Sequence, residues 1–279
     1  MTELLTVVLN LTTPLVLAAI AGYLSERAGV INIALEGKML AAACTAGLVG
    51  MRAGPIAAVI AAMLVAAALS LAHVALTQRL RIDQVVSGMA LNAVAAGGTN
   101  FLFSRLSDQD RSGRIPALPN AVFWTLAVVV PIALSVYVQR SRAGIHLIAA
   151  GSDAEKARLA GLHPLRIRTV ALIGTGLLTG LAGAFLVADT GVFTDNMTAG
   201  RGYIALAALI LGGWRILPAT LSCIVLGLLT SLGLLLQGTK INGGTVPSEF
   251  WTALPYLATV LALAGFLGRN RTPTGLGKV

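Results

Sequence analysis

The sequence has few charged side chains: Asp, Glu, Lys and Arg together make up 11% of its 279 residues. A soluble globular domain carries about 25% of such residues, so this chain cannot coat a water-exposed globule of its size. It also has only two cysteines, Cys44 and Cys223, and both lie within apolar runs. That arrangement excludes a secreted disulfide scaffold and indicates small packing residues instead.

Patterns that bind nucleotides or metals are also missing. The sequence has no Walker A loop, no His-Glu-x-x-His helix and no Cys-x-x-Cys pair. The three histidines, His73, His146 and His163, are scattered, and no nucleophile, base and oxyanion group come together. We therefore expect no catalytic residue and no metal site, and we do not expect this chain alone to be an enzyme or to bind a cofactor.

The net charge of +9 does not indicate a nucleic-acid partner. A nucleic-acid binder gathers its basic residues on one face, whereas here they lie in short segments between long apolar runs. Such runs are typical of a polytopic membrane protein, in which about 20 apolar residues cross the hydrocarbon layer as a helix. The mean hydropathy of +0.85 agrees, and we expect contact with membrane lipid and none with nucleic acid.

The apolar runs predict about nine transmembrane helices in one all-α membrane domain covering residues 1–279. The predicted ranges are 4–24, 30–50, 54–76, 84–103, 121–138, 169–188, 202–217, 218–237 and 251–267. The second and seventh ranges are interrupted, one by Glu36-Gly37-Lys38 and the other by the Gly-Gly-Trp-Arg sequence at 212–215.

The distribution of basic residues predicts the orientation in the membrane. With nine spans and an outer N-terminus, 13 of the 20 Lys and Arg residues lie in inner segments, six lie in outer segments and Lys38 lies within a span. Because cytoplasmic segments carry an excess of Lys and Arg, we expect the N-terminus outside and the C-terminus in the cytoplasm.

Two patterns concern how the helices pack. Gly176, Gly180 and Ala184 recur at four-residue steps and fit a close-packed seam, although a glycine-rich membrane chain also produces such steps by chance. The sequences 27–31 and 201–204 open the second and seventh spans from opposite faces, as an inverted repeat would; five residues also arise by chance.

The longest charged segment, residues 139–168, carries six Lys and Arg against two acids, and we expect it in the cytoplasm. A short helix is predicted over 152–161. Ser152 and Glu155 match a capping box at its start, Gly161 ends it and Pro164 follows. So short a helix is marginal in water. It either lies in a groove on another protein or rests on anionic lipid.

Polar residues lie at membrane depth, where an ionisable side chain costs at least about 2.5–3.5 kcal/mol. Asn32, Glu36 and Lys38 belong to the second span and Asn92 to the fourth. Glu36 and Lys38 are two residues apart and therefore point to different sides of a helix. Gly37 between them permits a local break. These side chains either line a solute path or tether neighbouring helices.

Three charged residues, Asp189, Asp195 and Arg201, bound the expected outer loop 189–201. They form either structural pairs at the surface or a docking surface for an external binding protein.

Four blocks resemble ABC importer permeases of the group that transports sugars, nucleosides and branched-chain amino acids. The blocks are AGVINIALEGKML at 28–40, SGMALN at 87–92, AAGSDAEKARLAGL at 149–162, and GRGYIALA with GGWR within 200–215. Their order and their spread over most of the chain are more specific than any single block. The chain is most similar to the smaller permease of nucleoside importers that are served by basic-membrane-lipoprotein-type receptors.

The resemblance implies a helical permease like those of vitamin B12-type importers, with inverted-repeat character, in a bacterial inner membrane. It implies three partners: a second, longer permease or another copy of this chain, a cytoplasmic ABC ATPase that holds ATP-Mg, and an external solute-binding lipoprotein or protein. It also implies a role for segment 139–168 as the coupling loop.

The implied site residues fall in two groups. The candidate path residues are Asn32, Glu36, Ser87 and Asn92. The candidate residues for coupling to the ATPase are Gly151, Ser152, Ala154, Glu155, Ala157, Arg158 and Gly161.

The function expected from the resemblance is ATP-driven import of nucleosides or related ribosyl or sugar solutes, with branched-chain amino acids as another substrate class. A different hypothesis is a secondary transporter driven by an ion gradient, with Glu36 as the carrier carboxylate. A third is a structural membrane subunit without a solute path. The sequence does not name the solute.

Overall fold

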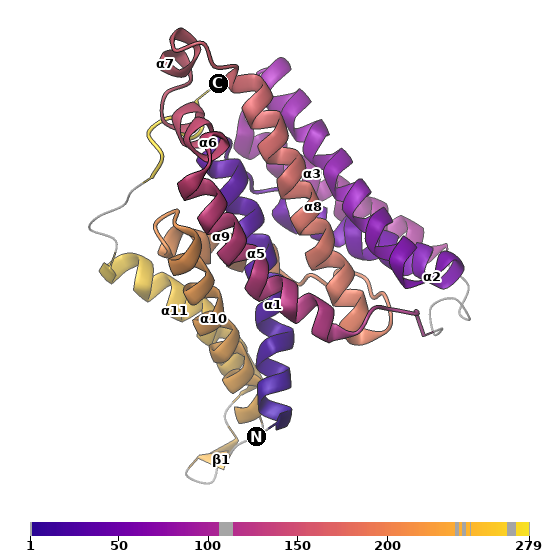
Figure 1. The fold of residues 1–279 in the computed structure, drawn as a ribbon. Coiled ribbons are helices and arrows are strands. Elements are labelled where there is room, and N and C mark those ends of the chain that lie inside the picture. Colours follow the sequence, from indigo (N-terminus) through magenta and orange to yellow (C-terminus); the bar gives the residue numbers. More distant parts are fainter. Residues whose placement is uncertain are drawn as a thin grey trace.

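The computed structural model describes residues 2–105, 114–237, 240–241, 244–245, 247–266 and 272–278. These residues form a helical bundle with one short hairpin (Figure 1). The helices of the first half are α1 (Thr2–Arg27), α2 (Leu35–Val74), the π-helical turn η1 (Ala75–Arg79), α3 (Gln84–Ser104) and α5 (Asn120–Arg140). Those that follow are α6 (Arg142–Ser152), α7 (Ala154–Leu159), α8 (Pro164–Thr190), α9 (Arg201–Leu211), α10 (Ile216–Leu236) and α11 (Ser248–Phe266). The hairpin joins β1 (Lys240–Ile241) to β2 (Gly244–Thr245) in antiparallel register.

Among the described residues, six helices are long and apolar enough to cross a membrane: α1, α2 with η1, α3, α5, α8 and α10. The longest of them is not one continuous span. Gly54 has φ 82° and ψ 177°, and Pro55 follows it, so α2 consists of two helices on either side of residue 54. This break lies where the second predicted span, 30–50, gives way to the third, 54–76.

The second and seventh predicted spans are shorter than expected. Residues 28–34 are not helical, so α2 begins only at Leu35. The eleven residues of α9 rise about 16 Å, about half the hydrocarbon thickness. Turn residues 212–214 then separate α9 from α10. The interruption that the sequence predicted within the second span is misplaced. Glu36, Gly37 and Lys38 are helical, and the non-helical residues precede them.

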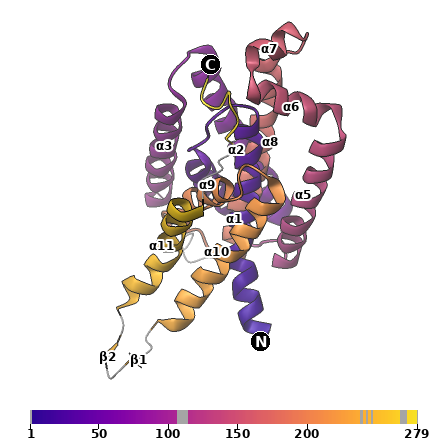
Figure 2. The same cartoon turned by 90° about the vertical axis from the view of Figure 1, so that its left-hand side faces the viewer.

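Helix α8 lies at the centre and packs most extensively against α2 and α1. Figure 2 shows α3 on one side of this centre and α5 on the other. A Cβ atom at Gly176 would lie 2.4 Å from the Cα atom of Ala67, and one at Gly180 would lie 2.4 Å from that of Met63. Two backbones approach this closely only where a side chain is absent. The predicted glycine seam is therefore confirmed, with α2 as its partner.

The N-terminus lies at one end of the bundle, whereas α6, α7 and the C-terminal segment lie together at the other (Figure 1). The single helix predicted over 152–161 is replaced by two helices, because α6 continues to Ser152 and α7 covers only Ala154–Leu159. Ser152 does not cap a helix; its hydroxyl donates to the carbonyl oxygen of Ile148. The capping residue is Asp153, whose carboxylate accepts from the N–H groups of Glu155 and Lys156. A carboxylate at this position binds the free N–H groups of the first turn.

Candidate functional site

Two helices, α2 and α9, begin inside the molecule and meet at one carboxylate. Glu36, in the first turn of α2, accepts hydrogen bonds from the backbone N–H of Gly200 at 2.7 Å and of Gly202 at 2.6 Å. These N–H groups open α9, and the start of a helix leaves such donors without intrahelical partners. Its partial positive charge also favours an anion there. Glu36, only 8% exposed, therefore joins the beginnings of two helices.

The close approach at this point depends on glycine. A Cβ atom at Gly202 would lie 2.6 Å from the backbone nitrogen of Glu36. Gly37 meets α3 in the same way, because its Cβ atom would lie 2.8 Å from the Cα atom of Asn92. Gly37 thus permits close helix packing here, and not the local break that the sequence suggested.

Asn92 ties α3 to both helix beginnings. Its side-chain oxygen accepts from the N–H of Gly37 at 2.8 Å, and its amide nitrogen donates to the carbonyl oxygen of Ile33 at 3.0 Å. The same nitrogen lies 2.9 Å from the hydroxyl oxygen of Tyr203 on α9 and donates to it. Asn92 is half-buried and Tyr203 is 47% exposed, so this pair reaches the surface of the chain.

Asn32 and Lys38 form a separate buried chain of polar groups. The ammonium of Lys38 donates to the side-chain oxygen of Asn32 at 3.0 Å, and the Asn32 amide nitrogen donates to the hydroxyl of Ser25 at 3.2 Å. Each of the three side chains has 0% exposure. Glu36 and Lys38 therefore have different partners, as their two-residue spacing predicts.

Ser87 is 1% exposed, and its hydroxyl has no hydrogen-bond partner within the described parts of the chain. The next residue, Gly88, packs against Ile33 and Ala34 of the non-helical segment that precedes α2. Of the four candidate path residues, then, Asn92 reaches the surface, while Asn32, Glu36 and Ser87 are buried behind it.

Other residues that hold the non-helical segment 28–34 were not singled out from the sequence. Gln84 accepts from the N–H of Ile31 at 2.6 Å, and Arg168 donates to the carbonyl oxygen of Ala28 at 3.2 Å. Glu26, just before the segment, accepts from the indole N–H of Trp214. Trp214 lies in one of the sequence blocks that resemble importer permeases, and Gln84 lies just before another of these blocks. No sequence pattern indicated a role for Glu26 or Arg168.

Small residues and polar groups occur together on part of α3 and on the helices near it. On α3, Gly97 and Gly98 have open space where a side chain would stand, and the Asn92–Tyr203 pair lies nearby on α3 and α9. Tyr256 on α11 is 50% exposed. Figure 2 shows α3 at the left of the bundle and α9 and the upper part of α11 near its centre.

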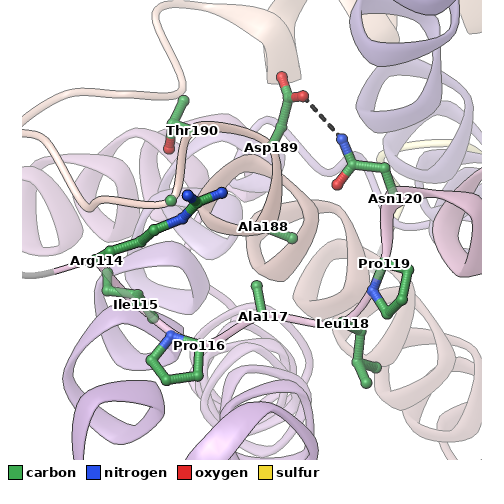
Figure 3. Close-up of a pocket in the computed structure, with 11 residues that line it drawn as sticks. Arg114, Ile115, Pro116, Ala117, Leu118, Pro119, Asn120, Ala188, Asp189 and Thr190 are labelled. Atoms are coloured by element: carbon green, nitrogen blue, oxygen red, sulfur yellow. Dashed lines mark hydrogen bonds between the residues drawn. The ribbon is translucent and has the colours of Figure 1, made fainter.

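At the end away from α7, a groove of about 540 Å³ lies between residues 114–120 and 188–191. Figure 3 shows Asp189 and Asn120 pointing toward each other, with Arg114 entering from the opposite side. The Asn120 amide donates to Asp189 at 3.0 Å. The other two charged residues of this outer loop also have structural partners: Asp195 accepts from Asn100, and Arg201 donates to two backbone carbonyls of the loop.

At the opposite end, α7 presents a mixed surface. Ala157 is buried at 4% exposure, whereas Leu159 is 80% exposed. Lys156 and Arg158 are exposed, and Gly161 ends the turn with φ +81°. Hydrogen bonds from Lys156 hold the pKa of the Asp153 carboxyl below its ordinary value. The sequence directed attention to the alanines, but the side chain that is free to meet another surface is Leu159.

Comparisons with known proteins agree with this architecture. Residues 4–263 match the family described as branched-chain amino acid transport system / permease component. The nucleoside ABC transporter permease protein NupC of Lactococcus lactis is 32% identical over 95% of this chain and 92% of its own length. The guanosine ABC transporter permease protein NupQ of Bacillus subtilis is 30% identical over the same shares. The putative glucose ABC transporter permease protein TsgC13 of Haloferax volcanii is 30% identical over 85% of this chain and 79% of its own.

The matched region includes all the helices that form the Glu36 and Asn92 contacts, as well as the segment with α6 and α7. The match covers most of the chain, and the helices are long and apolar enough for several membrane crossings. The chain therefore belongs to the permease-component family of branched-chain amino acid transport systems and is a multi-pass ABC transporter permease.

Proposed function

We propose that this permease imports nucleosides, or closely related ribosyl or sugar solutes, across a bacterial inner membrane. The observation that carries the substrate class is the 30–32% identity, over 95% of the chain, to permeases named for nucleosides and guanosine. The relative named for glucose supports the wider sugar class. Branched-chain amino acids, which give the family its name, are the competing substrate class.

The solute path runs along the face with α3, α9 and α11. The exposed Tyr203 and the half-buried Asn92 contribute its polar groups, and an aromatic hydroxyl beside an amide suits a ribosyl or sugar hydroxyl and the face of a base. Asn32, Glu36 and Ser87 are buried beneath these groups and fix the shape of the path. In this arrangement Glu36 holds α2 against α9, because its two oxygens accept from the N–H groups of Gly200 and Gly202.

The ATPase binds the end of the molecule that carries α7. Leu159 is the apolar contact and Lys156 and Arg158 flank it, while Gly151, Ser152, Ala154, Glu155, Ala157 and Gly161 shape and position the helix. Leu159 is 80% exposed, and the other exposed side chains of α7, Glu155, Lys156 and Arg158, are charged. ATP-Mg belongs to that partner and not to this chain.

The wider assembly follows the vitamin B12-importer arrangement, with nine membrane segments in which α9 and the first half of α2 are partial spans. The N-terminus is outside and α7 and the C-terminus are cytoplasmic, which places the groove of Arg114 and Asp189 toward an external solute-binding protein. A second, longer permease faces α3 and α9 and completes the path.

The experiment is uptake by membrane vesicles that contain the chain, its partner permease, the ATPase and the solute-binding protein. Labelled guanosine is offered with excess unlabelled uridine, glucose or leucine as competitor. We expect ATP-dependent uptake that the nucleoside competes away and leucine does not. Uptake that leucine abolishes would overturn the nucleoside proposal in favour of branched-chain amino acids.

A further inference from the structure

The C-terminal segment 272–278 returns to the end of the bundle that carries α7. Figure 1 shows this segment, in yellow, beside the first turns after α1 and next to α6. Pro273 and Gly275 are buried, although both lie within seven residues of the C-terminus. The segment is therefore packed against the rest of the chain, and its hydrogen bonds show against which parts.

One side of the segment binds the junction between α6 and α7. The N–H of Gly275 donates to the carbonyl oxygen of Gly151 at 3.1 Å. The hydroxyl of Thr274 donates to the backbone carbonyl oxygen of Ser152 at 2.8 Å. These are the two residues directly before Asp153, which caps α7. A Cβ atom at Gly275 would lie 2.8 Å from the Gly151 oxygen, so no larger residue fits without moving the segment.

The other side binds the segment that leads into α2. The N–H of Gly277 donates to the carbonyl oxygen of Gly29 at 3.2 Å. The guanidinium of Arg168 donates both to the carbonyl oxygen of Lys278 at 3.0 Å and to that of Ala28 at 3.2 Å. Arg168 is 4% exposed, and a guanidinium that bonds two chain segments at once fixes their separation.

The two regions that segment 272–278 binds also contact each other directly. A Cβ atom at Gly151 would lie 1.9 Å from the carbonyl oxygen of Arg27, so the end of α6 rests directly on the turn at the end of α1. From Gly29 the chain runs to Ile33 and then to Glu36, where Asn92 and α9 are attached. A movement of α7 therefore has a short, packed route to the candidate path.

We infer that segment 272–278 is a strap that makes α7 and the entry segment 28–34 move together, with Thr274, Gly275, Gly277 and Arg168 as its positioning residues. This inference rests on the proposed docking of the ATPase at α7. Without the strap, α7 still presents Leu159 to the ATPase. A displacement of α7 then only shifts the contact between Gly151 and Arg27 and is not transmitted to Glu36.

Three variants test the strap in the assembled importer: removal of residues 272–279, Gly275→Val, and Lys278→Ala as the matched control. The control keeps the backbone carbonyl that Arg168 binds and changes only an exposed side chain. The readouts are the amount of assembled complex, the ATPase rate and the solute taken up per ATP hydrolysed. That ratio does not change if a variant merely lowers the amount of folded permease.

We expect truncation and Gly275→Val to assemble with the ATPase and to hydrolyse ATP, with uptake per ATP about tenfold lower, within the usual range of coupling between sites. Lys278→Ala keeps the normal ratio. An unchanged ratio in the truncated chain would overturn the inferred role of the strap. Parallel losses of assembled complex, ATP hydrolysis and uptake would also overturn it, because they indicate that the segment only stabilises the fold. If the intact importer shows no ATP-dependent uptake, the proposed function itself has failed.

Discussion

The Glu36 carboxylate accepts the backbone N–H of Gly202 at 2.6 Å, across 166 residues of sequence. This bond fixes the start of α9 against the start of α2, two helices that both begin inside the molecule. A carboxylate used in this way is a structural acceptor at a helix N-terminus. It is not a free carrier group, which the hypothesis of an ion-driven transporter requires.

Replacing Glu36 separates these two roles. Glu36→Ala leaves two buried N–H groups without an acceptor, and each costs about 1–3 kcal/mol, so we expect a lower melting temperature and loss of uptake. Glu36→Gln keeps one acceptor oxygen and should retain part of both. Thermal denaturation and ATP-driven uptake are compared with Glu3→Gln, a control on the exposed first turn of α1. A Gln variant with normal stability and no uptake would show that the charge itself is needed.

The Asn92–Tyr203 pair allows stability to be separated from solute binding. Asn92→Leu removes the acceptor for Gly37 N–H and the donor to Ile33, so we expect it to destabilise the protein by about 1–3 kcal/mol. Tyr203→Phe removes an exposed hydroxyl and its hydrogen bond from Asn92, whose amide nitrogen still donates to Ile33. The stability of this variant should therefore stay within about 0.5 kcal/mol of the original, while the KM for the solute rises. Equal KM values for the Phe variant and the original chain would remove Tyr203 from the path.

The seam between α8 and α2 predicts a strong positional effect of side-chain size. Gly180→Val places a side chain where a Cβ atom alone would lie 2.4 Å from the Cα of Met63. Overpacking costs about 1–3 kcal/mol or more, so we expect little folded protein after membrane extraction. Gly97→Val on α3 is the control, because nothing lies within 4 Å of a Cβ atom there. Equal yields of the two variants would contradict the packing described.

The surface of α7 predicts which substitution uncouples transport cleanly. Leu159→Asp changes a side chain that is 80% exposed, so the fold should be unaffected while binding of the ATPase is lost. Ala157→Glu, at a buried position, should instead disturb α7 itself. Co-purification of the ATPase and thermal denaturation distinguish the two. Normal ATPase binding by Leu159→Asp would place the docking surface elsewhere.

The sequence predicted the positions of the apolar helices well, because a run of about 20 apolar residues has few alternatives in a membrane. The Gly176–Gly180 seam was also recognisable, since small residues at four-residue steps lie on one helix face. The break before α2 was placed a few residues too late. Glu36-Gly37-Lys38 looked like an interruption, but Glu36 and Gly37 are satisfied by Gly202 and Asn92 from distant parts of the chain, and Lys38 is satisfied by Asn32, six residues before it.

The site was predicted less completely, for the same reason. Asn92 was identified by its polarity within a span, but Tyr203, Arg168 and Gln84 gain their roles only from residues that the fold brings near. The cap of α7 was assigned to Ser152 because Ser-x-x-Glu matches a capping box, yet α6 continues through Ser152 and leaves Asp153 as the first non-helical residue. Local patterns identify a helix start to within a residue or two, and a neighbouring helix decides between them.

In the proposed mechanism, ATP hydrolysis by a partner moves α7 and thereby opens the path beside Asn92 and Tyr203. The most direct measurement is uptake of labelled guanosine by vesicles of the complete importer, energised either by ATP without an ion gradient or by a proton or sodium gradient without ATP. We expect uptake only with ATP, and none with ATP when the chain carries Leu159→Asp. Uptake driven by the gradient alone would show that this permease does not depend on an ATPase.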